Sequence, residues 1–198
     1  MPLSTADINA LLSTWASGAL YVSVHSAYSA TGANELSGGS YARVAVTWGS
    51  PAGGSIALSG TPYSVNIPAS STAAFVGFWS ALSGGTFQGM FPGGNAPAYT
   101  FAAPSSTDTL LAPGSAYVAN QPVVVFPTAG STIPTGLTAG VIYYVISPSS
   151  DSFELSATSG GSAINLTADG SGIVQAITPD VFGSAGTYSV AGATLTGV

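Results

Sequence analysis

The sequence has almost no basic side chains. Its 198 residues include one arginine, Arg43, and one histidine, His25, but no lysine and no cysteine. Without cysteine the chain has no disulfides, thiolate nucleophiles or cysteine metal sites. Proteins neutralise nucleic-acid phosphates mainly with lysine and arginine, and this chain has a formal net charge of −6. We therefore expect no nucleic-acid partner.

Charged residues of both signs together make up only 4% of the chain. Solubility must therefore rest on serine, threonine, asparagine and glycine, and a monomer would lack the mixed charged surface that usually keeps proteins apart. We expect much of the surface to be buried against other subunits. The apolar segment at residues 8–15 is too short for a signal peptide or a membrane span. A soluble product made in the cytoplasm, with no membrane partner, is expected.

Glycine, proline and hydrophobic residues are abundant. Hydrophobic residues make up 46% of the chain, which is ample for a core, and 26 glycines and 13 prolines lie between short β-branched runs. This spacing is typical of tight turns between many short strands. One helix is expected at the N-terminus, where Ser4 and Asp7 form a capping pattern and apolar residues from Ile8 to Trp15 recur at helical spacing before Gly18. The helix is expected to cover a sheet or barrel end; docking onto a neighbouring subunit is the alternative.

Beyond Gly18 the hydrophobic pattern has a period of two. Val22 and Val24 alternate with Ser23 and His25, which predicts a half-buried strand. Further strands are expected over residues 41–48, 55–58, 63–67, 74–80, 86–91, 98–101, 109–111 and 186–195. The expected fold class is all-β, a β-sandwich of jelly-roll type with a short N-terminal helix.

Residues 119–176 differ from the rest of the chain in their pattern of hydrophobic residues. Compact strand-like runs at 123–126, 141–146 and 152–155 are separated by turns, and the alternating style of the first half returns after residue 186. We expect residues 119–176 to be an inserted small β domain. It would interrupt the terminal hairpin of a domain formed by residues 1–118 plus 177–198.

Glu35 and Arg43 are the only carboxylate and cation that lie close together in the sequence, on either side of a glycine-rich turn. A bidentate ion pair between them is expected to lock this turn. A contact between subunits is the alternative role, and catalysis is the least favoured one.

The remaining polar candidates are expected to be structural. His25 has no nucleophile elbow and no partner histidine in the sequence, so a hydrogen-bonded strand histidine is expected. The acids Asp108, Asp151, Asp169 and Asp180 are scattered singly and read as turn formers or solvated charges, with residues 169–172 as a turn. A paired-carboxylate glycosidase site would require proximity that the sequence does not show. No metal, no cofactor and no enzyme activity are expected.

Several segments resemble a family of small tailed-phage virion proteins, whose members are labelled tail fibre proteins or capsid decoration proteins. These segments are residues 22–27, 31–43, 46–48, 76–79 and 83–85. The resemblance covers residues 1–118 and 181–198, although this chain has Ala27, Tyr28 and Ser29 where the family commonly has Asp-Pro. Residues 133–140, 143–145 and 153–156 are similar to a small β repeat of phage structural proteins, an accessory module without known catalysis.

The resemblance implies a non-enzymatic structural protein located in the virion. A capsid decoration or cement protein on the outside of the head is the favoured role, with the major capsid protein or other virion proteins as partners and a homotrimer as the assembly. The alternative is a tail fibre or minor tail protein that binds host-surface glycans. Its candidate binding residues are the aromatic side chains Trp79, Phe91 and Tyr99.

Overall fold

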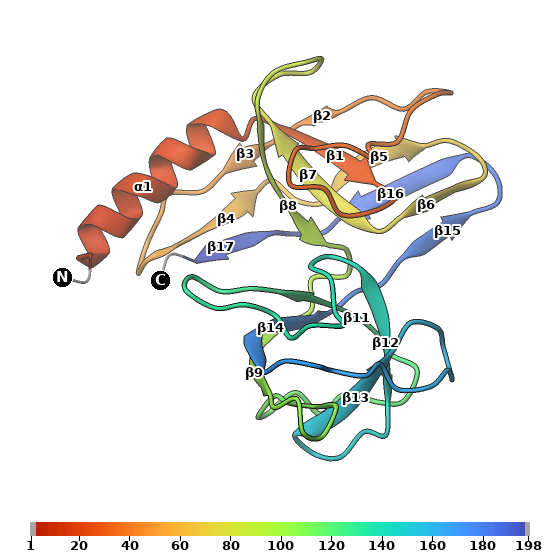
Figure 1. The fold of residues 1–198 in the computed structure, drawn as a ribbon. Helices are drawn as coiled ribbons and strands as arrows, with labels where there is room; N and C mark the ends of the chain where they lie inside the picture. Colours follow the sequence, from red (N-terminus) through yellow and green to blue (C-terminus); the bar gives the residue numbers. More distant parts are fainter. Residues whose placement is uncertain (1–2, 197–198) are drawn as a thin grey trace. The chain divides into compact units, whose positions relative to one another are not determined.

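The computed structural model describes residues 3–196 and divides the chain into two compact units. We call residues 3–95 and 179–196 the split unit, and Ala96–Thr178 the barrel unit. The all-β prediction is confirmed, because a single helix of 14 residues accompanies seventeen short strands within the described residues (Figure 1). The jelly-roll arrangement stays a prediction.

The helix α1, Thr5–Gly18, begins at the predicted cap. The Ser4 hydroxyl oxygen accepts a hydrogen bond from the Asp7 backbone N–H at 3.2 Å, and the Asp7 carboxylate accepts one from the Ser4 N–H at 3.2 Å. This reciprocal capping satisfies two backbone donors that a helix leaves unpaired. The Ser4 hydroxyl also donates to the Asp7 carboxylate at 2.6 Å, and this bond together with that from the Ser4 N–H lowers the pKa of Asp7.

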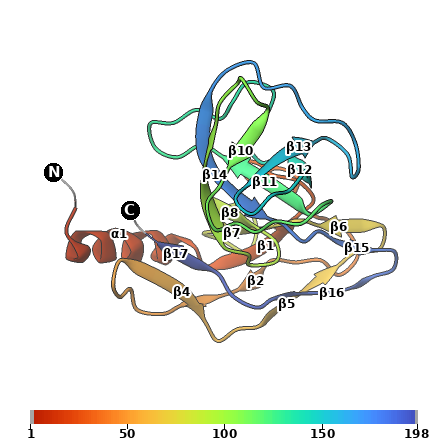
Figure 2. The ribbon, with the colours of Figure 1, turned by 90° about the horizontal axis from the view of Figure 1, so that it is seen from below.

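One face of α1 is buried against strands of the split unit. Leu12 and Ala16 form a small core with Ile56 of β4 (Ser55–Ser59), and Leu195 of β17 (Thr194–Thr196) packs against that core. Figures 1 and 2 both show α1 alongside these two strands. Within this chain the helix therefore covers a sheet.

The strands of the split unit form one four-stranded sheet and three smaller antiparallel sheets. The large sheet has the order β2-β1-β7-β8, and the small sheets are β17-β4-β3, β16-β5 and β15-β6. The bounds not yet given are β1 Tyr21–His25, β2 Val44–Ala45, β3 Thr47–Trp48, β5 Tyr63–Ile67, β6 Ser71–Ala73, β7 Phe75–Trp79, β8 Phe87–Pro92, β15 Asp180–Phe182 and β16 Gly186–Val190.

The central strand β1 differs from its prediction. A half-buried strand was expected, but Ser23 and His25 are as fully buried as Val22 and Val24. The valines enter the main core of the split unit, while the two polar side chains face a second buried layer, described below. The prediction is wrong because alternation of polar and apolar residues does not distinguish solvent from a satisfied polar interior.

The barrel unit is a closed six-stranded barrel with the strand order β10-β13-β12-β11-β14-β9, part of which is visible end-on in Figure 2. The bounds are β9 Ala98–Ala103, β10 Thr109–Leu111, β11 Pro122–Phe126, β12 Ile142–Ile146, β13 Ser152–Ser156 and β14 Gly170–Ala176. Its interior is filled by side chains from all six strands, including Phe101, Leu110, Val123, Val145, Phe153 and Val174.

The barrel unit begins earlier than the sequence analysis placed its inserted domain. The compact unit runs from Ala96 to Thr178 instead of 119–176, because β9 and β10 complete the barrel. The flanking chain does not form one hairpin either, since β8 pairs with β7 and β15 pairs with β6. Short strands look alike in sequence, so periodicity does not reveal which sheet they join.

Part of β14, the longest strand of the barrel, lies where the sequence predicts a turn at residues 169–172. Residues 170–172 begin this strand and pair with β9. Gly172 lacks a side chain because a Cβ there would lie 2.2 Å from the Phe126 carbonyl oxygen. A glycine in a strand can mark the close approach of another backbone segment, as it does here. The sequence alone does not distinguish such a glycine from one in a turn.

Candidate functional site

Arg43 and Glu35 form a bidentate ion pair. Arg43 Nε donates to Glu35 Oε1 at 2.9 Å, and Nη2 donates to Oε2 at 2.7 Å. The two side chains are only 10% and 18% exposed. Two parallel bonds fix the orientation of both side chains, and limited solvent screening strengthens the pair. The structure thus brings together the two residues that the sequence analysis paired.

Arg43 also holds segments that the sequence did not connect to it. Its Nη1 donates to the backbone carbonyl oxygens of Ala81 at 2.9 Å and Gly84 at 2.7 Å, both in the turn between β7 and β8. The guanidinium carbon lies 3.7 Å from the centroid of the Trp79 ring, a cation–π contact. One cation therefore ties the β1–β2 loop, the β7–β8 turn and the end of β7 together.

Tyr41 links this pair to the central strand. Its hydroxyl donates to Glu35 Oε1 at 3.0 Å and accepts a hydrogen bond from the Val24 backbone N–H at 3.0 Å. Burial raises the pKa of Tyr41, with the neighbouring Glu35 charge as a smaller contribution. The hydroxyl therefore keeps its proton and remains the donor to Glu35.

Ser23 and His25 form a buried polar layer on the side of β1 opposite the main core of the split unit. His25 Nδ1 lies 2.9 Å from the Ala33 carbonyl oxygen, which only accepts, so Nδ1 carries the proton. His25 Nε2 then accepts from the Ser23 hydroxyl at 2.7 Å, and Ser23 Oγ accepts from Trp79 Nε1 at 3.1 Å. Burial lowers the pKa of His25, which agrees with a neutral imidazole. Every donor in this chain of hydrogen bonds has an acceptor.

The Ser23 hydroxyl and the His25 imidazole are the groups of a nucleophile and a base, but no substrate can reach them. Both side chains have 0% exposure. Gly77 of β7 lies directly over them, and a Cβ there would sit 2.5 Å from His25 Nε2 and 2.7 Å from Ser23 Oγ. A reacting serine must present its oxygen to a substrate. In this structure the pair packs two strands together.

In the barrel unit three aspartates clamp loops by accepting hydrogen bonds from distant backbone N–H groups. Asp169 Oδ1 accepts from both the N–H and the hydroxyl of Ser105 at 2.8 Å, and these bonds lower the pKa of Asp169. Two further clamps have the same form: Asp108 accepts from Leu166 at 2.7 Å, and Asp151 accepts from Gly114 at 2.8 Å. The expectation of turn formers or solvated charges fits Asp108, which lies in a turn, and Asp180, which is exposed at the start of β15. It does not include the long-range partners of Asp108, Asp151 and Asp169.

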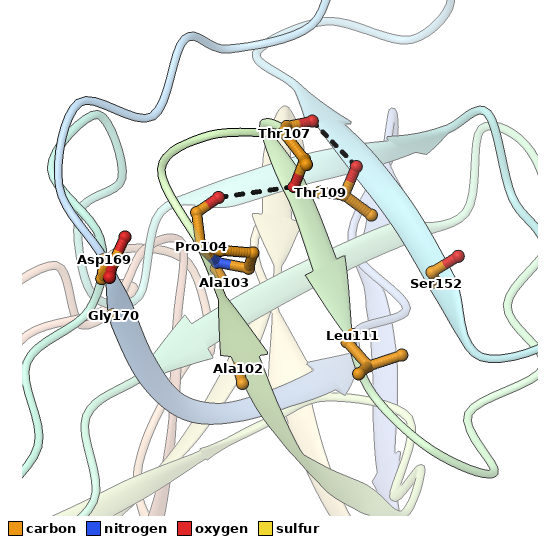
Figure 3. A pocket seen from close by; sticks show the side chains of 9 residues that line it. All are labelled: Ala102, Ala103, Pro104, Thr107, Thr109, Leu111, Ser152, Asp169 and Gly170. Carbon is orange, nitrogen blue, oxygen red and sulfur yellow. Dashed lines mark hydrogen bonds between the residues drawn. The ribbon is translucent and has the colours of Figure 1, made fainter.

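An open groove of about 480 Å³ lies on the outer face of the barrel unit (Figure 3). Three outward-facing residues form a cross-strand row along it, since Leu111 pairs with Ala102 on one side and with Ser152 on the other. Thr107 and Thr109 add hydroxyl groups, and Asp169 stands at one end (Figure 3). Leu111 is 49% exposed in the middle of the row.

The three aromatic candidates for surface binding each pack against other side chains of their own unit. Trp79 is stacked against Arg43 and lies edge-on to Phe87 at 5.1 Å. Phe91 packs against Phe78 of the core at 5.4 Å. Tyr99 belongs to the barrel unit and is half-buried against its core. Each ring is thus largely occupied by its own unit.

Within residues 3–196, no group of histidine, aspartate or glutamate side chains is arranged to hold a metal ion. In the same part of the chain, no helix has the length and apolar character needed to cross a membrane.

Comparison with known proteins returns no relatives. No protein-family model matches the sequence, and no curated protein or solved structure is significantly similar to it.

Proposed function

We propose that this chain is a non-enzymatic structural protein of a phage virion, and specifically a capsid decoration protein on the outside of the head. The observation that carries the proposal is the use of the chain's only arginine and only histidine inside the split unit. Both groups hold loops and strands together in segments that resemble virion proteins. Residues that an enzyme would place in an open cleft here support the scaffold.

A jelly-roll sandwich for the split unit and a homotrimeric assembly belong to the same proposal. The main core supports the sandwich, because it gathers side chains from β1 and β7 of the large sheet together with Val65 of β5 and Val190 of β16. The scarcity of surface charge supports an assembly. Sedimentation of the purified protein at three times its chain mass of 19.3 kDa is expected, and a strict monomer would count against the trimer.

The second candidate is a tail fibre or minor tail protein that binds host glycans. Less supports it, because one face of Trp79 is covered by Arg43 and Phe91 packs against the core. An accessible aromatic platform is the usual means of holding a sugar, and neither side chain provides one.

Antibody labelling of particles purified from the phage lysate tests the location directly. Gold label on the head is expected, whereas label confined to the tail would favour the second candidate. Mass spectrometry of the same particles should use chymotrypsin, because a single arginine yields only two tryptic peptides. Absence of the chain from purified particles would overturn both candidates.

A further inference from the structure

The groove on the barrel unit combines an apolar floor with one charged end. Ala102 and Leu111 contribute the floor, Pro104 adds an apolar edge, and Asp169 contributes the charge (Figure 3). A volume of about 480 Å³ is in the range of ligand sites and suits a few residues of an extended chain. Leu111 is half-exposed, so covering it with an apolar residue of a partner would bury apolar surface and favour binding.

The Asp169 carboxylate is charged and rigidly held. Both hydrogen bonds from Ser105 end on Oδ1, which leaves Oδ2 available to a ligand. The same bonds lower the pKa of Asp169, so the group is ionised at neutral pH. A preorganised carboxylate beside apolar surface favours a cation that also carries aliphatic groups.

The net negative charge of the barrel unit also favours a cationic partner. Residues 96–178 contain four carboxylates, Asp108, Asp151, Glu154 and Asp169, and no lysine, arginine or histidine. The only strong cation of the chain, Arg43, belongs to the split unit and is already paired. An anionic unit without internal compensation attracts a cationic partner and repels an acidic one.

We propose that this groove binds an extended segment of a partner protein in which a lysine or arginine lies beside apolar residues. The basic side chain pairs with Asp169, and the neighbouring apolar residues cover Leu111 and Ala102. This inference rests on the groove and the charge of the barrel unit alone, and holds whether or not the protein is part of a virion.

The test uses the full-length protein labelled with ¹⁵N and observed by NMR. The probe is a capped pentapeptide, proline-leucine-arginine-leucine-proline, whose prolines favour an extended chain. The control peptide replaces arginine with citrulline, which has a similar shape without the charge. We expect the arginine peptide to shift the backbone signals of Ala102, Thr109, Leu111, Ser152 and Gly170, and to bind about tenfold more tightly than the citrulline peptide.

Two variants and a control distinguish loss of binding in the groove from loss of the hydrogen bonds between Asp169 and Ser105. Asp169→Asn should weaken binding about tenfold but also disturbs Ser105. Ser152→Trp fills the groove without touching that clamp and should abolish binding. Thr100→Trp, on the outer face of β9 but outside the groove, is the matched control and should bind like the original protein.

Three results would overturn the proposal. They are no shifts at millimolar peptide, equal affinity for the citrulline peptide, or binding that survives Ser152→Trp. Shifts of the same signals with N-acetylglucosamine but not with the peptide would also overturn it, in favour of a sugar site.

Discussion

The two units use ionisable side chains in different ways. In the split unit an arginine, a glutamate and a histidine lie inside, and each buried polar group is paired with another side chain or a carbonyl oxygen. In the barrel unit exposed aspartates accept hydrogen bonds from backbone N–H groups of remote loops. Loss of one buried partner leaves an unpaired charge, whereas water replaces a lost exposed bond. The split unit should therefore be far more sensitive to a single substitution.

Arg43→Ala should have the largest effect. It leaves Glu35 without its cationic partner, with only the Tyr41 hydroxyl still donating to it, and it removes the bonds to Ala81 and Gly84. We expect a loss of about 3 kcal/mol in the free energy of unfolding. All three tryptophans, at positions 15, 48 and 79, lie in the split unit, so tryptophan fluorescence during denaturation reports this unit.

The pair itself is isolated by comparing Arg43→Ala, Glu35→Gln and the double variant. The double variant should lose clearly less stability than the two single losses combined. Simple additivity would mean that the two residues do not stabilise each other.

Gly77→Ala should have the next largest effect. A methyl group would enter the space between β7 and the Ser23–His25 pair, and overpacking of this kind costs about 1–3 kcal/mol. Gly183→Ala is the matched control, because a Cβ there meets no atom within 4 Å. Equal fluorescence midpoints for the two variants would show that the pair is not tightly packed against Gly77.

The two units should also differ in their response to mild acid. Burial lowers the pKa of His25 in the folded state, so the unfolded chain binds more protons below its ordinary pKa of about 6.5. Stability of the split unit is complete above that pH and falls as the pH drops toward the folded pKa. The barrel unit contains no histidine and should be unchanged over this window.

The check is a series of fluorescence-monitored denaturation curves between about pH 5 and pH 8, with His25→Gln as the control. The variant should show a flatter pH dependence. An identical slope in both proteins would remove His25 as the cause.

The smallest effect is expected from Asp169→Asn in the barrel unit. This carboxylate has a lowered pKa, so its contribution is present above about pH 4 and is lost as the pH falls through the folded value. Because the group is exposed, the change should be local. Hydrogen exchange should accelerate at the Ser105 amide, while Gly114, which is clamped by Asp151, serves as the internal control. Unaltered exchange at Ser105 would show that the clamp has no protective role.

Local sequence signals predicted the parts of the fold that depend on neighbours in the chain. The capping pattern of Ser4 and Asp7 located α1, and Glu35 and Arg43 are only eight positions apart. The bonds from Arg43 to Ala81 and from Asp169 to Ser105 join positions 38 and 64 residues apart. Nothing in periodicity or composition specifies such partners, because they depend on which strands pair. The groove was missed for the same reason.

Replacing the barrel unit by a linker tests most directly whether the two units are stabilised separately. In one variant a short glycine-serine linker replaces residues 96–178, and in a matched variant it replaces only 119–176, which leaves β9 and β10 without their barrel. We predict that the first variant keeps the fluorescence midpoint of the full chain, together with its His25-dependent slope. The second variant should aggregate through its unpaired strands. An unfolded first variant, or a stable and soluble second one, would contradict this account.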